Sequence, residues 1–275
     1  MSTPPRTLNE LFFGAMDRSA SRPVAMRVKR GGTWVGTSFA DLLSQVQAFS
    51  IGLHELGVNA GDRLAILSEN RPEWAVTDFA CLACRCADVP VYPTLPAHQI
   101  EYILRDSGAV AVCCSSAAQL GKILEIRGNL PALKTIVVFD ADAATGGAIT
   151  FESVLAKGRA AIPKYPTWRA DALAVKPDDL ATLIYTSGTT GDPKGVMLTH
   201  GNITSDVVAG LQVLDLRQSD ECLSFLPLSH IFERMAGHYC MTQQGAIINY
   251  ATSIESVPIE MGELRPTVVC SVPRL

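Results

Sequence analysis

The 275-residue sequence lacks long hydrophobic runs and any excess of positive charge. Nowhere do about 18 consecutive apolar residues occur, and Met1–Arg22 has no cationic start followed by an apolar stretch. The 23 Lys and Arg are outnumbered by 27 Asp and Glu, which gives a formal net charge of -4. A protein that binds nucleic acid by neutralising phosphates needs the opposite balance. We therefore expect a soluble, cytoplasmic protein that does not bind nucleic acid.

The sequence has eight cysteines but lacks a paired metal motif. Cys81, Cys84 and Cys86 form the only close cluster, in an apolar segment with no second CxxC and no histidine at ligand spacing. A structural zinc site usually has four such ligands. Disulfides are also disfavoured, because the sequence has no export signal. We expect these cysteines to be reduced and to pack as small buried hydrophobic residues.

The hydrophobic pattern predicts an α/β fold with mainly parallel sheets. Short β-branched runs alternate with stretches whose apolar residues recur every three or four positions, and 48% of all residues are hydrophobic. The predicted strands are 24–28, 33–35, 63–67, 89–92, 109–113, 135–139, 180–185 and 196–198. The predicted helices lie between Ser38 and Gly57 and over 72–84, 97–105 and 117–127. Two stretches rich in small residues, 141–149 and 162–167, are predicted connections, and we place a subdomain junction near 141–178.

One polar loop carries the strongest chemical signal. The apolar run Leu180–Tyr185 leads into TSGTTGDPKG, in which hydroxyl side chains alternate with glycines and a lysine follows. Glycines let a backbone approach a ligand closely, while amides, hydroxyls and an ammonium group replace the water around phosphate oxygens. An ordinary hairpin turn before 196–198 is the alternative, but it needs fewer hydroxyls. A Walker A loop is disfavoured, because Pro193 stands where its second glycine belongs.

The segment YTSGTTGDPKG, Tyr185–Gly195, resembles the phosphate loop of the adenylate-forming superfamily, which includes acyl-CoA synthetases, luciferases and peptide-synthetase adenylation domains. The segment FLPLSHIFER, Phe225–Arg234, resembles the next motif of that superfamily in its long-chain acyl-CoA synthetase form. SENRPEW, Ser68–Trp74, and VPVYPTLP, Val89–Pro96, agree with the same branch. The four motifs occur in the order of that superfamily, and the resemblance extends from Leu8 to Leu275.

The resemblance implies two half-reactions with ATP, Mg²⁺ and coenzyme A. A fatty acid and ATP give an acyl-adenylate and pyrophosphate, and the thiol of coenzyme A then displaces AMP. Lys194 would act on the phosphates as a catalytic cation, and Thr186 would also face the magnesium. The residues implied in nucleotide binding are Thr186, Ser187, Gly188, Thr189, Thr190, Gly191 and Lys194.

The second motif implies a substrate-binding group. The resemblance places His230 beside the substrate carboxylate and the entrance of the acyl tunnel, as a catalytic gate or donor. The alternative from the residues alone is a histidine that caps the helix starting near Ser229. Glu233 and Arg234, on one face of that helix, are predicted to pair with each other or to brace the loop beside the substrate. Trp74 is predicted to be a packing residue.

Relatives of this kind are about twice as long, so we expect residues 1–275 to be part of a large N-terminal domain. The remainder of that domain, the adenine and ribose motifs and the small C-terminal domain with its catalytic lysine have no counterpart here. We expect a long-chain fatty acid:CoA ligase activity for an intact protein and an inactive isolated chain. A ligase for an aryl or amino acid and a non-catalytic nucleotide-binding fragment are the alternatives. Peripheral membrane contact and a homodimer also stay open.

Overall fold

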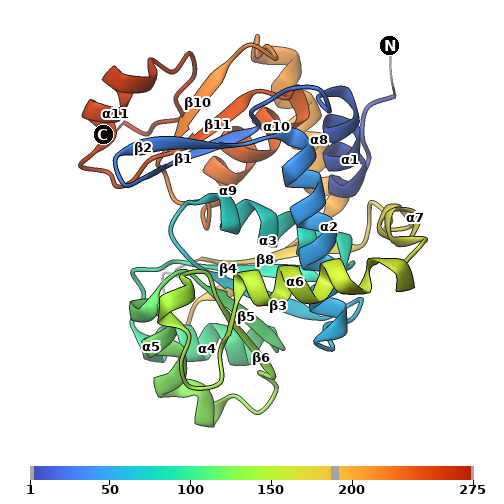
Figure 1. The fold of residues 1–275 in the computed structure, drawn as a ribbon, viewed down its shortest axis with the longest axis vertical. Coiled ribbons are helices and arrows are strands. Elements are labelled where there is room, and N and C mark those ends of the chain that lie inside the picture. Colours follow the sequence, from blue (N-terminus) through green and yellow to red (C-terminus); the bar gives the residue numbers. More distant parts are fainter. Residues whose placement is uncertain (1–2, 187–191, 274–275) are drawn as a thin grey trace. The chain divides into compact units, whose positions relative to one another are not determined.

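The computed structural model describes residues 3–186 and 192–273. The chain forms two compact units (Figure 1). The first comprises Met1–Ser44, Asn70–Pro72 and His200–Leu275, and the second comprises Gln45–Glu69 and Glu73–Thr199. Among the described residues, no helix combines the length and the apolar character needed to cross a membrane.

The second unit contains a seven-stranded sheet in the order β7-β6-β5-β3-β4-β8-β9. All neighbouring strands pair in parallel except β8 and β9, which are antiparallel. The strands are β3 (Arg63–Leu67), β4 (Ala87–Val91), β5 (Ala111–Cys114), β6 (Thr135–Val138), β7 (Ile149–Thr150), β8 (Leu180–Thr186) and β9 (Lys194–Thr199). Its helices are the end of α2 (Phe39–Glu55), α3 (Pro72–Ala83), α4 (Ala97–Ser107), α5 (Ala117–Ile126), α6 (Phe151–Ala161) and α7 (Trp168–Leu173), with short 3-10 turns at Arg127–Asn129, Ala141–Ala143 and Ile162–Lys164.

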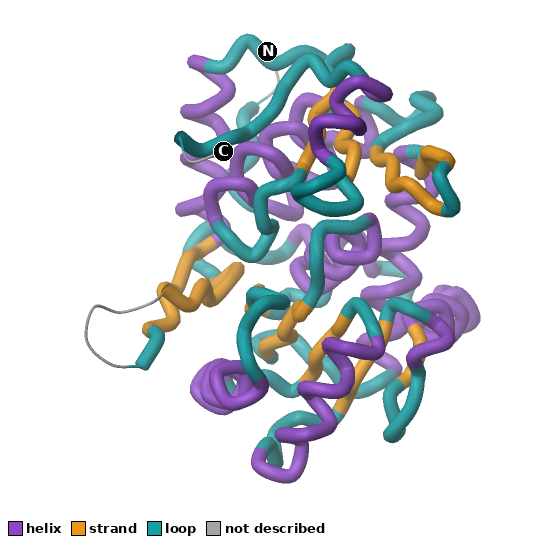
Figure 2. Tube along the Cα trace, turned by 90° about the vertical axis from the view of Figure 1, so that its left-hand side faces the viewer, coloured by secondary structure: helices purple, strands orange, loops and turns teal. Residues whose placement is uncertain are grey.

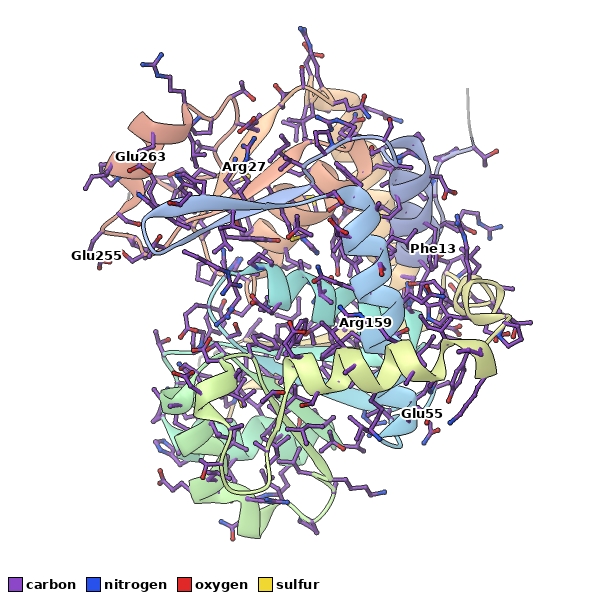
Figure 3. The ribbon with its side chains drawn as sticks, in the orientation of Figure 1. Phe13, Arg27, Glu55, Arg159, Glu255 and Glu263 are labelled. Carbon is purple, nitrogen blue, oxygen red and sulfur yellow. The ribbon has the colours of Figure 1, made fainter. Side chains whose placement is uncertain are left out.

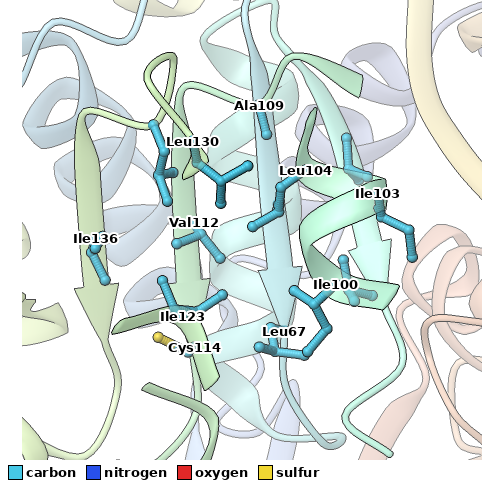
Figure 4. Close-up of a cluster of buried hydrophobic side chains, with 14 of the residues drawn as sticks. Leu67, Ile100, Ile103, Leu104, Ala109, Val112, Cys114, Ile123, Leu130 and Ile136 are labelled. Carbon is cyan, nitrogen blue, oxygen red and sulfur yellow. The ribbon is translucent and has the colours of Figure 1, made fainter. Parts of the chain in front are cut away.

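Helices cover both faces of this sheet, which explains why its central strands are almost wholly apolar. Helices α4 and α5 lie on one face and α3 and α6 on the other (Figure 1). Figure 2 shows helices on both sides of the strands of this unit. Alternate residues of the strands, such as Leu67, Val112 and Ile136, pack against Ile100 and Ile123 of α4 and α5 (Figure 4). Successive side chains of a strand point to opposite faces, so both faces of the central strands contribute to the core.

The first unit contains a four-stranded sheet in the order β10-β11-β1-β2. Its strands are β1 (Met26–Arg30), β2 (Thr33–Thr37), β10 (Glu221–Ser224) and β11 (Ile247–Tyr250), and its helices are α1 (Leu8–Arg18), α8 (His200–Val213), α9 (Ile231–Glu233), α10 (Met241–Gln244) and α11 (Val257–Leu264). The β1–β2 hairpin turns through Gly31 and Gly32, which have φ of 55° and 82°. Arg27 of β1, labelled in Figure 3, pairs with Glu221 of β10 at 2.6 Å.

The α/β class and nearly all predicted elements are confirmed, with ends shifted by a few residues. Helix α6 was not predicted, because it lies between the two stretches taken as connections. It packs closely on α2: a Cβ added to Gly158 would lie 1.7 Å from the carbonyl oxygen of Ala48. The segment 141–178, predicted to hold a subdomain junction, lies within the second unit, and the boundaries between the units fall elsewhere.

Candidate nucleotide and carboxylate sites

The predicted phosphate loop connects two antiparallel strands, β8 and β9. We call β8, β9 and the loop between them the phosphate-loop hairpin. Thr186 and Lys194 are partners in the register of the two strands, so the hydroxyl and the ammonium group stand at the mouth of the loop. Both residues are exposed. The other predicted nucleotide ligands, Ser187, Gly188, Thr189, Thr190 and Gly191, lie outside the described residues.

Tyr185 anchors the hairpin just below its open end. Its hydroxyl donates to Asp106 Oδ2 of α4 at 2.5 Å. Its ring lies over Gly195, its partner in the register, where an added Cβ would come within 3.0 Å of the ring. Burial, followed by the hydrogen bond to Asp106, raises the pKa of Tyr185, so the hydroxyl remains a donor. The two ends of the loop are therefore held by a buried aromatic residue that carries no charge.

The hairpin also agrees with the departure of this loop from the Walker A pattern. A Walker A loop leads into a helix, whose N-terminal amides and dipole hold phosphate. Here Lys194 begins a strand that continues to Thr199. In the described residues on either side of the loop, β8 ends at Thr186 and β9 begins at Lys194, so no helix N-terminus lies there to hold an anion as in a Walker A loop.

The second motif forms a turn and a helix in the first unit. We call residues 224–240 the His230 segment. His230 is exposed and is the N-cap residue of α9, where its Nδ1 accepts from Phe232 N at 3.2 Å. The capping interpretation is therefore confirmed. Because Nδ1 accepts, the neutral ring carries its proton on Nε2, and that N–H is a hydrogen-bond donor at the surface.

Glu233 and Arg234 are both buried, at 1% and 0% exposure. Glu233 Oε1 accepts from Ser224 Oγ of β10 at 2.6 Å, and the guanidinium of Arg234 lies 5.4 Å from the ring centre of Tyr239. Burial raises the pKa of Glu233 to about 8, so it is largely protonated at neutral pH. Glu233 thus braces the segment, as predicted, through a strand residue.

Asn70, from the SENRPEW motif, completes this network. Its Nδ2 donates to Ser224 Oγ at 3.1 Å and to Leu226 O at 2.7 Å, and its Oδ1 accepts from Leu228 N at 2.9 Å. Two of these three hydrogen bonds fix the backbone that leads to His230, and the third joins Asn70 to the Ser224 side chain. Sequence reasoning missed this role, because Asn70 and Ser224 are 154 residues apart and neither has a spacing signal.

The helix that follows His230 contains a seven-residue π-helical stretch, Arg234–Cys240, between α9 and α10. π-helical turns are rare and are frequent at functional sites. Gly237 lies in this stretch, and a Cβ there would come within 2.3 Å of Glu233 Oε1. The wider turn and the glycine together leave room for the buried carboxyl group.

The remaining motifs brace the carboxyl ends of the second unit's strands. Glu69 accepts from Ser115 Oγ at 2.5 Å and from Gln119 Nε2 at 3.0 Å. Lys122 Nζ donates to Pro93 O and Leu95 O of VPVYPTLP. Trp74 is fully buried, which confirms its packing role. These contacts join β3, β4 and α5 at the sheet edge where open α/β sheets place ligands.

Comparison with known proteins decides the family. A family model described as AMP-binding enzyme matches residues 14–275. This chain belongs to the AMP-binding enzyme family. It is 35% identical over 246 residues to the long-chain-fatty-acid–CoA ligase FadD15 of Mycobacterium bovis, a match that covers 89% of this chain and 40% of that protein. It is 34% identical over 291 residues to the peroxisomal long chain acyl-CoA synthetase 7 of Arabidopsis thaliana, covering 98% and 39%.

Solved structures of AMP-binding enzymes share the fold. The anthranilate CoA ligase AuaEII in complex with anthranoyl-AMP superimposes with a TM-score of 0.81 at 21% identity, covering 98% of this chain and 50% of that one. The N-terminal domain of FACL13 from Mycobacterium tuberculosis gives 0.78 at 23% identity, covering 98% and 63%. The chain spans about two fifths of the length of the curated relatives described above. It is an N-terminal part of the adenylate-forming fold.

Proposed function

We propose that this chain supplies the ATP-phosphate and carboxylate sites of an AMP-forming long-chain fatty acid:CoA ligase. The observation that carries the proposal is the in-register pair Thr186 and Lys194, which brackets a run of hydroxyls and glycines on a rigidly anchored hairpin. The names of the curated relatives support a fatty acid as the carboxylate.

The chemical difficulty is electrostatic. A fatty acid carboxylate must attack the already anionic α-phosphate of ATP, forming one P–O bond while pyrophosphate leaves. The thiol of coenzyme A then attacks the acyl carbonyl and AMP leaves. Fixed donors and cations around the phosphates lower the barrier without any covalent bond to the protein. In this proposal Lys194 neutralises charge on the leaving pyrophosphate.

Magnesium fits this arrangement as a companion of the nucleotide. Mg²⁺ in nucleotide sites takes most of its oxygen ligands from phosphates and water, and it would neutralise phosphate charge there. The exposed hydroxyl of Thr186 would supply one oxygen. Among the described residues, no group of three or more His, Cys, Asp or Glu side chains is placed to hold a metal ion by itself.

His230 has the right donor for a carboxylate. Its Nδ1 is used by the helix cap, so Nε2–H is left to donate, and Asn70 holds the backbone that presents it. In this proposal Nε2 donates to the fatty acid carboxylate, whereas Glu233 and Arg234 act from within the fold. A homodimer, peripheral membrane contact and a cytoplasmic location remain predictions.

The isolated chain is expected to bind ATP without turnover. None of its 275 residues matches the adenine, ribose or C-terminal lysine motifs that the resemblance requires. Calorimetric titration of ATP with Mg²⁺ should show binding that weakens about tenfold or more in Lys194→Ala, a loss of about 1.4 kcal/mol. Lys164→Ala is the matched control, because Lys164 is an exposed lysine paired with Glu55. Equal affinities in both variants would contradict the assignment of Lys194.

The substrate class needs a separate measurement. Non-hydrolysable acyl-sulfamoyl adenosines that carry a C16, an aryl or an aminoacyl group would be titrated into the chain. The long-chain compound should bind most tightly, and preference for the aryl or aminoacyl compound would favour the alternative ligases. Acyl-CoA formation by the isolated chain would overturn the expected inactivity.

A further inference from the structure

Three cysteines meet at the end of helix α3, where no role in acyl transfer is assigned to them. Cys81, Cys84 and Cys86 are buried and free, at exposures of 0%, 1% and 0%. They lie at the amino-terminal edge of the strands β3 and β4, because Cys86 directly precedes β4. The sequence predicted that they are small core residues, and their burial confirms it, but burial alone does not explain why three thiols lie together.

The backbone brings two of these side chains together. Cys86 N donates to Cys81 O at 3.1 Å and Arg85 N donates to Leu82 O at 2.9 Å, while Arg85 has φ of 59°. This is the Schellman arrangement, in which the side chains of the two residues joined by the 6→1 hydrogen bond, here Cys81 and Cys86, frequently pack on each other. The Cys81 and Cys86 side chains are also hydrogen-bonded to each other, which makes them the neighbours that a disulfide needs. Cys84 differs, because its Sγ donates to Ser50 O at 3.2 Å.

The Cys86 thiol has the character of the reactive partner. The hydrogen bond from Cys81 is the largest cause that lowers the pKa of Cys86, whereas burial raises the pKa of Cys81. A thiolate is the nucleophilic form of cysteine and the form that peroxides oxidise. In the structure the thiol is covered by the loop 57–62, and the protonated Cys86 Sγ donates to Asn59 O at 3.0 Å.

A route to Cys86 lies beside it. A cavity of about 310 Å³ is lined by Ala60 and Gly61 of the covering loop and by Arg85 and Ala87, the two neighbours of Cys86. The loop is exposed, and Gly57 and Gly61 have φ of 86°, a conformation in which glycine is unstrained. A local opening that breaks the contact to Asn59 would connect Cys86 with this cavity.

We propose that Cys81 and Cys86 form a peroxide-reactive dithiol that closes to a disulfide. The Cys86 thiolate attacks a hydroperoxide: an S–O bond forms, the O–O bond breaks, and the leaving oxygen takes a proton as water or an alcohol. The Cys81 sulfur then attacks the sulfenic acid of Cys86, forming the S–S bond and releasing water. The two sulfurs supply two electrons and the peroxide accepts them. A dithiol reductant returns the disulfide to two thiols and is itself oxidised to a disulfide.

Trypsin provides a direct test in the 275-residue chain. It cuts between Arg85 and Cys86 but not between Arg71 and Pro72, so Cys86 and the other two cysteines fall on separate peptides, 86–105 and 64–85. After brief exposure to hydrogen peroxide and blocking of free thiols, mass spectrometry should find these two peptides joined. Fragmentation should place the link on Cys81. A link on Cys84, or Cys86 oxidised to the sulfinic acid without a link, would overturn the proposal.

Cys113 supplies the internal control. It is fully buried in β5, and burial raises its pKa. Cys86 should be oxidised at least about tenfold faster than Cys113. The link between the two peptides should be absent in Cys81→Ala and present in Cys84→Ala. Equal rates for Cys86 and Cys113 would mean that oxidation follows general unfolding, and the proposal would be wrong. The wild-type chain decides the outcome even if a variant fails to fold.

Discussion

The phosphate-loop hairpin and the His230 segment place their polar residues in opposite environments. Thr186 and Lys194 are exposed at the mouth of the hairpin, and the buried anchor beneath them, Tyr185, carries no charge. In the His230 segment, Glu233, Arg234 and His238 are buried, and His230 is the ionisable side chain that reaches the surface. One region keeps its charge available to a ligand, and the other uses its ionisable groups within the fold.

This difference determines what each residue contributes. An exposed charge costs the fold little and changes stability little when it is removed. A buried polar group must be hydrogen-bonded or neutral, so its loss or ionisation destabilises the protein. Stability measurements on single variants should therefore separate the two regions, with large effects in the His230 segment and small effects at the hairpin mouth.

The largest effect is expected for Glu233→Gln as a function of pH. Burial raises the pKa of Glu233 from 4.5 to about 8, so folding takes up a proton between these values. The stability that this group contributes is fully present below its pKa in the unfolded chain. It is lost, by about 1.4 kcal/mol per pH unit, as the pH rises toward and through its pKa in the folded protein. The Gln variant stays neutral and keeps an acceptor for Ser224. In urea unfolding, the free energy of unfolding of the variant should rise relative to that of the wild type by on the order of 4 kcal/mol between pH 5 and pH 8.

Glu152→Gln is the matched control, because Glu152 is exposed in the first turn of α6. Its difference from the wild type should stay constant within about 0.5 kcal/mol across the same pH range. A difference for Glu233→Gln that does not change with pH would mean that Glu233 is ionised in the folded protein, and the contrast between the two regions would fail.

The next effect is expected for Asn70→Ala. This change removes three hydrogen bonds and leaves Leu228 N without its acceptor. We expect a loss of about 3 kcal/mol in the free energy of unfolding. Asn129→Ala is the control, since the exposed Asn129 donates to Glu101 alone, and it should cost under about 0.5 kcal/mol. Equal losses in the two variants would show that the Asn70 network does not stabilise the His230 segment.

Much of the fold follows from the sequence because burial leaves a periodic pattern. The strand 63–67 was predicted to the residue, since both faces of β3 are covered and almost the whole run is apolar. Helix α6 was not predicted because the stretches on either side of it, 141–149 and 162–167, are rich in small residues and were predicted to be connections. Its packing partner, Ala48, lies more than 100 residues earlier, so no local signal announces the contact.

The candidate site divides in the same way. Lys194 and His230 could be proposed from the sequence because each lies inside a continuous motif, and their roles toward ATP and the carboxylate stay predictions. Asn70 and Ser224 could not be joined, because their contact depends on how β10 and the turn after β3 fold together. For Glu233 the sequence left two alternatives open, a pair with Arg234 or a brace of the loop, and its burial and its hydrogen bond to Ser224 favour the brace.

A smaller effect is expected for Tyr185→Phe, which tests the anchor within the hairpin. The ring would still pack over Gly195, and the change removes the hydroxyl that donates to Asp106. We expect about 1–2 kcal/mol less stability, because the acceptor is a carboxylate. Tyr102→Phe is the control. Tyr102 is half-buried one turn before Asp106 on α4, so this variant measures the effect of losing a tyrosine hydroxyl there. A Tyr185→Phe variant as stable as the wild type would mean that packing alone holds the hairpin.

The smallest effect is expected for Lys194→Ala. Lys194 is exposed at the first position of β9, and its backbone pairing with Thr186 does not depend on the side chain. The free energy of unfolding in urea should therefore change by less than about 0.5 kcal/mol, even though the same variant is expected to lose ATP affinity. A variant that binds ATP poorly and also unfolds easily would mean that Lys194 supports the hairpin, as Glu233 supports its helix. Stability retained with affinity lost would instead assign the lysine to the ligand, because a residue that contributes nothing to folding has its interactions free for the phosphates.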